Sequence, residues 1–441
     1  MKDTAIQAFF FTEALLESHR QINLQKKNYG PINRLIIFGK LLDANYREIP
    51  SPNTDTVYVG LTFNVKKEPL VLDIPAGEPD RYYVVPFYDA YTNVFESLGT
   101  RTNKTEGGTY LIVAPDFTGD IPEGMKVIKA PTYIGTVIGR YLVKGKEDLP
   151  NVVAIHKQIK VATLSEWQSN NIPESVWALD DPKGDDKIII PDYQNDPQAY
   201  WEAVNEILPL APVSEISKED FEKFSEFGIT QSGFKPNESN IKDLYEGTNE
   251  GWNQLKQIAT DVDSAKKMGV NFFESNNWSW SSVGSDPENT GKRNYGTEYE
   301  LRSWVNLLYY GMLPPQEALY PTAYVDQNKE KLHGQNQYEF TININNQPNF
   351  NKGFWSVTLY DMEGYFYDNA PKIYKLSDRT KGIKIKENGD ITIRISHEKP
   401  SDLEVNWLPA PLDNFYLMLR SYLPIPSLVS GEYSIQPVVK I

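Results

Sequence analysis

The spacing of apolar residues changes twice along this 441-residue chain, and this change constrains the fold more than any other feature. In residues 61–65 apolar and polar side chains alternate with a period of two, which is typical of a half-buried strand. In residues 197–208 and 297–312 the apolar residues instead follow a helical repeat. Clean alternation returns after residue 314, as in residues 338–344. The pattern predicts two β-rich parts separated by helices.

We therefore expect a mainly β protein with a helical insert, organised in four regions. Residues 1–45 would form N-terminal helices, 46–165 a β-sandwich, 166–314 a helical segment and 315–441 a second β domain. Successive strands follow one another without long helices between them, which favours antiparallel sheets.

Shorter elements are expected within these regions. Residues 4–19 and 32–42 have helical apolar runs, and residues 276–295, rich in Trp, Ser, Asn and Gly, indicate a long loop. Two helix starts have the spacing of a capping box, Ser217 with Asp220 and Thr297 with Glu300.

The charge balance restricts the partners of the chain. It has 59 acidic and 44 basic residues, a net charge of −15, which argues against a nucleic-acid backbone or an anionic membrane as partner and favours a neutral or cationic one. The same excess of acid has a simpler use, which is to keep the protein soluble. No stretch approaches the roughly 20 apolar residues of a membrane span, so we expect no membrane insertion. Without cysteine there are no disulfides and no thiolate sites.

The start of the chain reads as a helix and not as a signal peptide, because Glu13 and Glu17 interrupt its apolar patch. As written, the chain would be cytoplasmic. If its start is instead a processed or engineered one, it would be periplasmic or secreted. The compartment and the oligomeric state stay open.

Two blocks far apart in the chain carry family signatures. SPNTDTVY at residues 51–58 resembles the domain-of-unknown-function family 1254, and NWLPAP at 406–411 resembles its usual companion, family 1214. The match continues through further segments: residues 81–102, Gly139-Arg140, residues 353–369 and Arg420-Ser421-Tyr422. The resemblance implies an immunoglobulin-like sandwich first, helices between, and a jelly roll last. It implies no general activity.

Familiar catalytic and cofactor motifs are missing. There is no Gly-x-Ser-x-Gly elbow, no His-Glu-x-x-His, no phosphate loop and no dinucleotide-binding glycine pattern, so we predict no cofactor. The four histidines lie in unrelated segments, which disfavours a histidine metal site. Residues 326–330 are rich in oxygen ligands but lack the glycine and the bidentate glutamate of an EF-hand. Calcium elsewhere in the last domain remains an alternative.

A first set of polar residues lies within apolar strand sequence of the first β domain. Its members are Asp55, Thr56, Asp89, Tyr91, Asn93 and Arg101. One hypothesis places them in a single pocket, where an aspartate near an arginine positions a ligand or acts as a base. The alternative is structural, with Asp55 bonding a turn and Arg101 in a buried ion pair with Asp55 or Asp89.

A second set lies in the last domain. Its members are Trp355, Asn406, Trp407 and Arg420. Aromatic faces beside amides suit a sugar or another flat polar ligand. The alternative is that the two tryptophans belong to the core.

Three functions remain open at this point. The leading hypothesis is a protein that binds a polar or carbohydrate-like small molecule between its β domains. The second is a cofactor-independent hydrolase or lyase in which Asp55 or Asp89 is the base and Arg101 or Arg420 stabilises negative charge. The third is a structural or surface-interaction protein.

Overall fold

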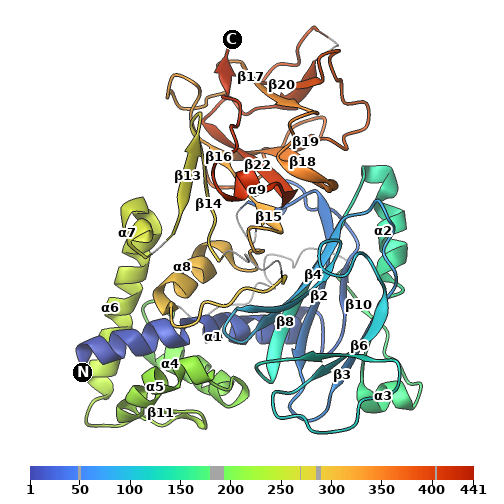
Figure 1. Ribbon diagram of the computed structural model, residues 1–441. Helices are drawn as coiled ribbons and strands as arrows, with labels where there is room; N and C mark the ends of the chain where they lie inside the picture. Colours follow the sequence, from blue (N-terminus) through green and yellow to red (C-terminus); the bar gives the residue numbers. More distant parts are fainter. Residues whose placement is uncertain (48–50, 179–192, 269, 285–289, 403–404) are drawn as a thin grey trace.

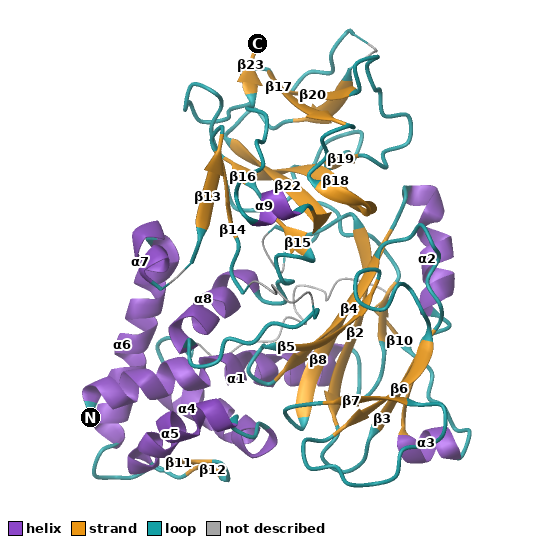
Figure 2. Cartoon of the chain, viewed as in Figure 1, coloured by secondary structure: helices purple, strands orange, loops and turns teal. Residues whose placement is uncertain are grey.

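The computed structural model describes residues 1–47, 51–178, 193–268, 270–284, 290–402 and 405–441. The described chain is mainly β with several helices, and it divides into three parts that Figure 1 shows side by side. We call them the N-terminal β unit (strands β1 to β10), the helical unit (α1 and α4 to α8) and the C-terminal β unit (β13 to β23). Figure 2 shows the strands concentrated in the two β units and the helices gathered beside the N-terminal one.

The N-terminal β unit contains two sheets packed face to face. Their orders are β10-β1-β2-β8-β4-β5 and β7-β6-β3-β9. Apolar side chains from both sheets, such as Val57, Phe87 and Ile112, share one buried core. The strands are β1 Ile36–Phe38, β2 Thr56–Asn64, β3 Leu70–Ile74, β4 Tyr83–Asp89, β5 Val94–Gly99, β6 Gly108–Val113, β7 Lys126–Lys129, β8 Ile134–Leu142, β9 Lys160–Thr163 and β10 Val176–Ala178, with the short helices α2 Leu149–His156 and α3 Leu164–Gln168.

The helical unit is built around the N-terminal helix. Its helices are α1 Lys2–Asn28, α4 Pro197–Ile207, α5 Lys218–Lys223, α6 Ile241–Thr260, α7 Val262–Lys267 and α8 Tyr299–Tyr309, with a small hairpin of β11 Ile229–Thr230 and β12 Gly233–Phe234. Helices α1 and α6 approach closely at Gly251, where an added Cβ would lie 2.2 Å from the Phe9 ring. Glycine is therefore required at this crossing.

The C-terminal β unit again packs two sheets over one core. The larger runs β13-β14-β16-β22-β18-β19, with β15 paired to β22, and the smaller runs β21-β20-β17-β23. Trp278, Phe340 and Leu419 are among its buried residues. The elements are β13 Phe272–Ser275, β14 Trp278–Ser281, β15 Ala318–Leu319, β16 Thr322–Ala323, β17 Tyr338–Asn343, β18 Asn349–Asp361, β19 Lys375–Ser377, β20 Asp390–Ser396, β21 Asn406–Pro409, β22 Phe415–Pro424, α9 Pro426–Val429 and β23 Val439–Lys440.

The alternation of the strands leaves one face of each large sheet for the contact between the two β units. In β22 the side chains of Leu417 and Leu419 point into their own core, so Tyr416, Met418 and Arg420 lie on the opposite face. Tyr82 and Tyr422, one from each β unit, meet there with ring centroids 5.2 Å apart. No helix of the described residues is both long and apolar enough to cross a membrane.

Several local predictions were wrong. The expected helix at residues 32–42 is instead occupied by β1, because Ile36 and Ile37 pair with the edge of β2 and with β10. The sheets are not purely antiparallel, since β1/β10, β6/β7 and β20/β21 are parallel pairs. Within the expected loop, residues 278–281 form β14, which joins the C-terminal sheet through β16.

The two predicted capping boxes also fail. Ser217 makes no capping bond because a 3-10 turn runs directly into α5, and α8 begins at Tyr299 without a side-chain cap. The immunoglobulin-like and jelly-roll topologies remain predictions.

Candidate functional site

The block at residues 51–58 leads into β2, and its side chains and carbonyls reach across to the C-terminal β unit. The Asn53 amide donates 2.7 Å to the Tyr422 hydroxyl and 3.1 Å to the Thr56 hydroxyl. The Asn53 carbonyl oxygen in turn accepts the Asp55 amide at 2.6 Å, which is the Asx turn expected for this sequence. Thr56, the first residue of β2, therefore takes part in this turn through its hydroxyl.

Asp55 is fully buried and both of its carboxylate oxygens are occupied. One accepts a 2.6 Å hydrogen bond from the Ser356 hydroxyl, and the other is paired with the Lys375 ammonium. The partner of Asp55 is therefore a lysine of the other β unit, and not Arg101. This pair is one of the polar ties between the two units.

Arg420 lies on the facing strand β22 and is also buried. Its guanidinium donates 2.8 Å to the Ser51 carbonyl and 3.0 Å to the Thr358 hydroxyl, and it stands 5.4 Å from the centre of the Tyr360 ring. The described residues supply it with carbonyl and hydroxyl acceptors but with no carboxylate at ion-pair distance. Its positive charge is held in place without being directly neutralised.

Arg140, on β8 of the N-terminal β unit, is a second buried arginine in this region. One nitrogen donates 2.6 Å to the Gly311 carbonyl, which also accepts the Tyr88 hydroxyl at 2.7 Å. The other terminal nitrogen has no hydrogen-bond partner, and no ion pair to Arg140 is present in the described part of the chain. A guanidinium is always charged, so this is a buried cation with an unused donor.

Tyrosines connect the two arginines. Burial raises the pKa of the Tyr320 hydroxyl to about 12, while both Arg140 and Arg420 act on it in the opposite direction. The same two guanidinium groups act on Tyr422. Tyr58 lies under Arg140, with the guanidinium carbon 5.8 Å from its ring centre. We call Arg140, Arg420, Tyr58, Tyr320 and Tyr422 the two-arginine cluster.

The cluster is only partly closed. Tyr58 and Tyr320 are half-buried, and their hydroxyls form no hydrogen bond with any described residue. Met418 and Ile138 beside them are also half-buried. The arrangement offers phenol donors, flat ring faces and two positive charges to a bound group.

Arg101 belongs to a neighbouring network. Its Nε donates 2.6 Å to the Glu317 carboxylate, and the other oxygen of Glu317 accepts the Tyr82 hydroxyl at 2.6 Å. Glu317 is almost fully buried and follows the helical unit in the chain. Arg101 therefore joins the N-terminal sheet to the segment that enters the C-terminal β unit.

Asp89, Tyr91 and Asn93 lie together in a third network, at the turn between β4 and β5. Asp89 accepts the backbone amides of Tyr91 and Asn93 at 2.9 and 3.0 Å and the Asn93 side chain at 3.0 Å. The Tyr91 hydroxyl donates 3.0 Å to the Ala211 carbonyl, and Asn93 accepts the Tyr295 amide at 3.0 Å. Burial raises the pKa of Asp89 to about 6. This turn attaches the sheet to the helical unit.

The aromatic set of the last domain is mostly internal. Trp355 is fully buried and donates 3.0 Å to the Gln347 side chain. Trp407 is half-buried and donates 3.0 Å to the Ser396 carbonyl. Asn406 bonds both the amide and the carbonyl of Lys384, at 2.7 and 3.0 Å, and so closes a loop. Of the two predicted sets, only Arg420 lies in the two-arginine cluster.

Sequence reasoning missed the rest of this cluster. Arg140 is a charged residue inside the apolar strand at residues 134–142, and a charge in such a position is a signal that the sequence does contain. Tyr58 and Tyr320 carry no comparable signal, because tyrosines are frequent throughout this chain.

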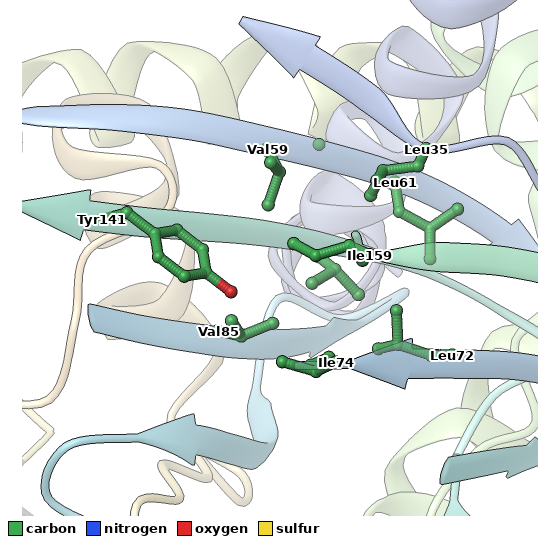
Figure 3. Close-up of a pocket in the computed structure, with 10 residues that line it drawn as sticks. Leu35, Val59, Leu61, Leu72, Ile74, Val85, Tyr141 and Ile159 are labelled. Atoms are coloured by element: carbon green, nitrogen blue, oxygen red, sulfur yellow. The ribbon is translucent and has the colours of Figure 1, made fainter. Parts of the chain in front are cut away.

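Other places in the described structure offer less. The cavity between the sheets of the N-terminal β unit, drawn in Figure 3, has a volume of about 10 Å³ and apolar walls such as Leu61, Val85 and Ile159. It has room for no more than about one water molecule, which is too little for a ligand. Within the described ranges no three His, Asp or Glu side chains gather in a way that would hold a metal ion.

Two protein families match this chain, and each matched region contains one of the two sequence blocks. Residues 32–163 match the family described as protein of unknown function (DUF1254), and residues 317–426 match the one described as protein of unknown function (DUF1214). No curated protein matches the chain.

Among solved structures, one match has a high fold similarity to this chain. The crystal structure of the VPA0106 protein from Vibrio parahaemolyticus superimposes with a TM-score of 0.76 at 22% identity, over 100% of this chain and 99% of that one. An uncharacterized protein from Burkholderia cenocepacia gives a TM-score of only 0.42 at 9% identity, over 98% of this chain and 87% of that one. The first likeness supports one fold over the whole length.

Proposed function

We propose that this chain, which carries a DUF1254 region and a DUF1214 region, binds a small polar ligand with an acidic group at the two-arginine cluster between its β units. The observation that carries the proposal is Arg140, a buried guanidinium with one unused nitrogen and no ion pair to a described carboxylate. Burying a charge is costly unless it is paired, so such a residue is explained most simply by a partner that arrives from outside.

The chemistry around Arg140 supports an anion. Arginine binds carboxylate and phosphate oxygens through parallel N–H donors, and the hydroxyls of Tyr58 and Tyr320 can donate to the same group. Arg420 adds a second positive charge, while the nearby Asp55 is already paired with Lys375. The net charge of −15 disfavours acidic ligands at long range, so the preference for an acidic group rests on the local charges of Arg140 and Arg420.

The ring faces support an organic ligand over an inorganic ion. Tyr58 and Tyr320 are half-buried, so part of each ring can pack against the C–H groups of a ligand. A sugar acid or a simple organic acid combines both features. The ligand is therefore carbohydrate-like or a small carboxylic acid.

The rival readings have less support. A hydrolase or lyase based on Asp55 or Asp89 needs a carboxylate that is free to take a proton, and both oxygens of each aspartate already accept hydrogen bonds or an ion pair. We also propose that the two β units correspond to the immunoglobulin-like sandwich and jelly roll that the family resemblance implies, since each is a pair of packed sheets.

A thermal-shift screen tests the proposal. The panel contains uronic acids and simple carboxylic acids, their methyl esters, neutral sugars and inorganic phosphate, at low ionic strength. Ligands that bind the folded state raise the melting temperature. We expect shifts with acids and none with the uncharged esters. Equal shifts with acid and ester, or no shift with any acid, would overturn the proposal.

A further inference from the structure

A second candidate site lies in the C-terminal β unit. A depression of about 650 Å³ is formed there by the turn between β17 and β18, the first residues of β18 and the end of β22. It shares no lining residue with the two-arginine cluster, although Leu423 directly follows Tyr422 in the chain. Its lining residues are Ile344, Asn345, Asn346, Gln347, Asn349, Phe350, Asn351, Lys352, Leu423 and Ile425.

The shape of the depression comes from an irregularity in the sheet. Asn349 pairs with Pro424 and Phe354 with Tyr422, so four residues of β18 face a single residue, Leu423, on β22. Gly353 lies in this bulge because an added Cβ would be 1.9 Å from the Tyr422 carbonyl. Bulges of this kind re-aim side chains at the edges of sheets. Here the bulge turns Phe350 outward, where it is 53% exposed.

The lining is unusually rich in amides and contains no carboxylate. Asn345, Asn346, Asn351 and Lys352 have side chains without a hydrogen-bond partner among the described residues. Each amide offers both donors and an acceptor. Surface asparagines also serve in turns, so their number alone would not define a site.

Asn349 supplies an independent observation. It is 93% buried and it lines the depression, and its amide nitrogen donates 3.0 Å to the Phe350 carbonyl. Its amide oxygen has no partner. A buried acceptor that lacks its hydrogen bond is costly, and a hydroxyl donor from a ligand would supply the bond after a small side-chain movement.

We propose that this depression binds a neutral carbohydrate. The ring of Phe350 packs on the C–H face of a sugar, the free amides bond its hydroxyls, and Asn349 accepts one of them. The absence of a carboxylate and of an arginine in the lining separates this ligand class from the acidic ligand of the two-arginine cluster. The proposal does not depend on that cluster.

A microarray of neutral and acidic glycans tests the proposal, with the full chain as the labelled probe. The variants are Phe350→Ala, Phe350→Trp and Asn351→Ala, all at exposed positions, so folding is not at risk. The control is Ile385→Ala, which removes an exposed apolar side chain outside the lining. We expect binding to neutral glycans that falls roughly tenfold in Phe350→Ala and is kept in Phe350→Trp and in the control.

Two results would overturn the assignment. One is the absence of binding to every neutral glycan on the array. The other is glycan binding that persists in Phe350→Ala and Asn351→Ala. Binding that is limited to acidic glycans and is lost in Arg140→Met would belong to the other site and would count against this one.

Discussion

The guanidinium of Arg420 donates a 2.8 Å hydrogen bond to the backbone carbonyl of Ser51, which lies 369 residues earlier in the chain. The bond joins the block at residues 51–58 of the N-terminal β unit to the facing strand of the C-terminal one. Asn53 with Tyr422 and Asp55 with Lys375 repeat the same connection. The two family regions of this chain are therefore one interlocked structure, and the candidate site lies where they meet.

The Asp55–Lys375 pair is predicted to be a structural tie. Asp55→Asn leaves the Lys375 ammonium, only 20% exposed, without its counter-charge and should destabilise the protein by about 3 to 5 kcal/mol. Urea denaturation measures this loss. Adding Lys375→Met to Asp55→Asn should recover part of it, because the unpaired charge is removed. A stable Asp55→Asn variant that no longer binds ligand would instead assign Asp55 to the site.

Glu13 is predicted to make stability fall as the pH rises. It lies on α1, 5% exposed, and accepts a 3.2 Å bond from the Asn306 amide. Burial raises its pKa from 4.5 to about 7, so the unfolded chain ionises first. The stabilising contribution is present below pH 4.5 and is lost between pH 4.5 and 7.

Glu13→Gln removes this dependence. As the pH rises from 4 to 8, the free energy of unfolding of the variant should increase by about 3 kcal/mol relative to that of the wild type. Urea denaturation at several pH values measures this difference. Glu300→Gln, at an exposed position on α8, is the control and should show no such trend. A constant difference across the pH range would contradict the prediction.

His156 is predicted to make stability fall as the pH falls. Both of its ring nitrogens are buried without a hydrogen bond, and its ring lies edge-on to Tyr141 with centroids 4.6 Å apart. Burial, with the nearby Arg81 charge, lowers its pKa from 6.5 to about 3, so the unfolded chain takes up the proton first. Stability is lost as the pH falls through this range. As the pH falls from 8 to 5, the free energy of unfolding of His156→Leu should therefore increase by about 2 kcal/mol relative to that of the wild type. The prediction would be refuted if the free energy of unfolding changed with pH in the same way in the two proteins.

Much of the fold could be predicted from the sequence where periodicity was long and regular. The helices α1, α4 and α8 and the strands β2 and β17 fall where their apolar patterns place them. Short apolar runs were ambiguous. Residues 36–38 became a strand because the edge of β2 was available for pairing, and no local signal carries that information.

The site was less predictable because its residues come from distant parts of the chain. The structural alternative paired Arg101 with Asp55 or Asp89, but its carboxylate partner is Glu317, 216 residues away. Asp55 found its partner 320 residues away, in Lys375. Charge type and burial could be anticipated, whereas the identity of each partner depends on how the two β units dock.

The most direct test of the central claim is calorimetric titration of an acid from the thermal-shift panel into the wild type and into Arg140→Met. Arg140 has no ion pair to break among the described residues, so Arg140→Met should cost no more than about 1.5 kcal/mol of stability. Arg34→Met is the matched control, because Arg34 lies in the same β unit but is paired with Glu166 at 2.7 Å. We predict that binding is lost in Arg140→Met and kept in Arg34→Met. Unchanged affinity in a folded Arg140→Met variant would contradict the account.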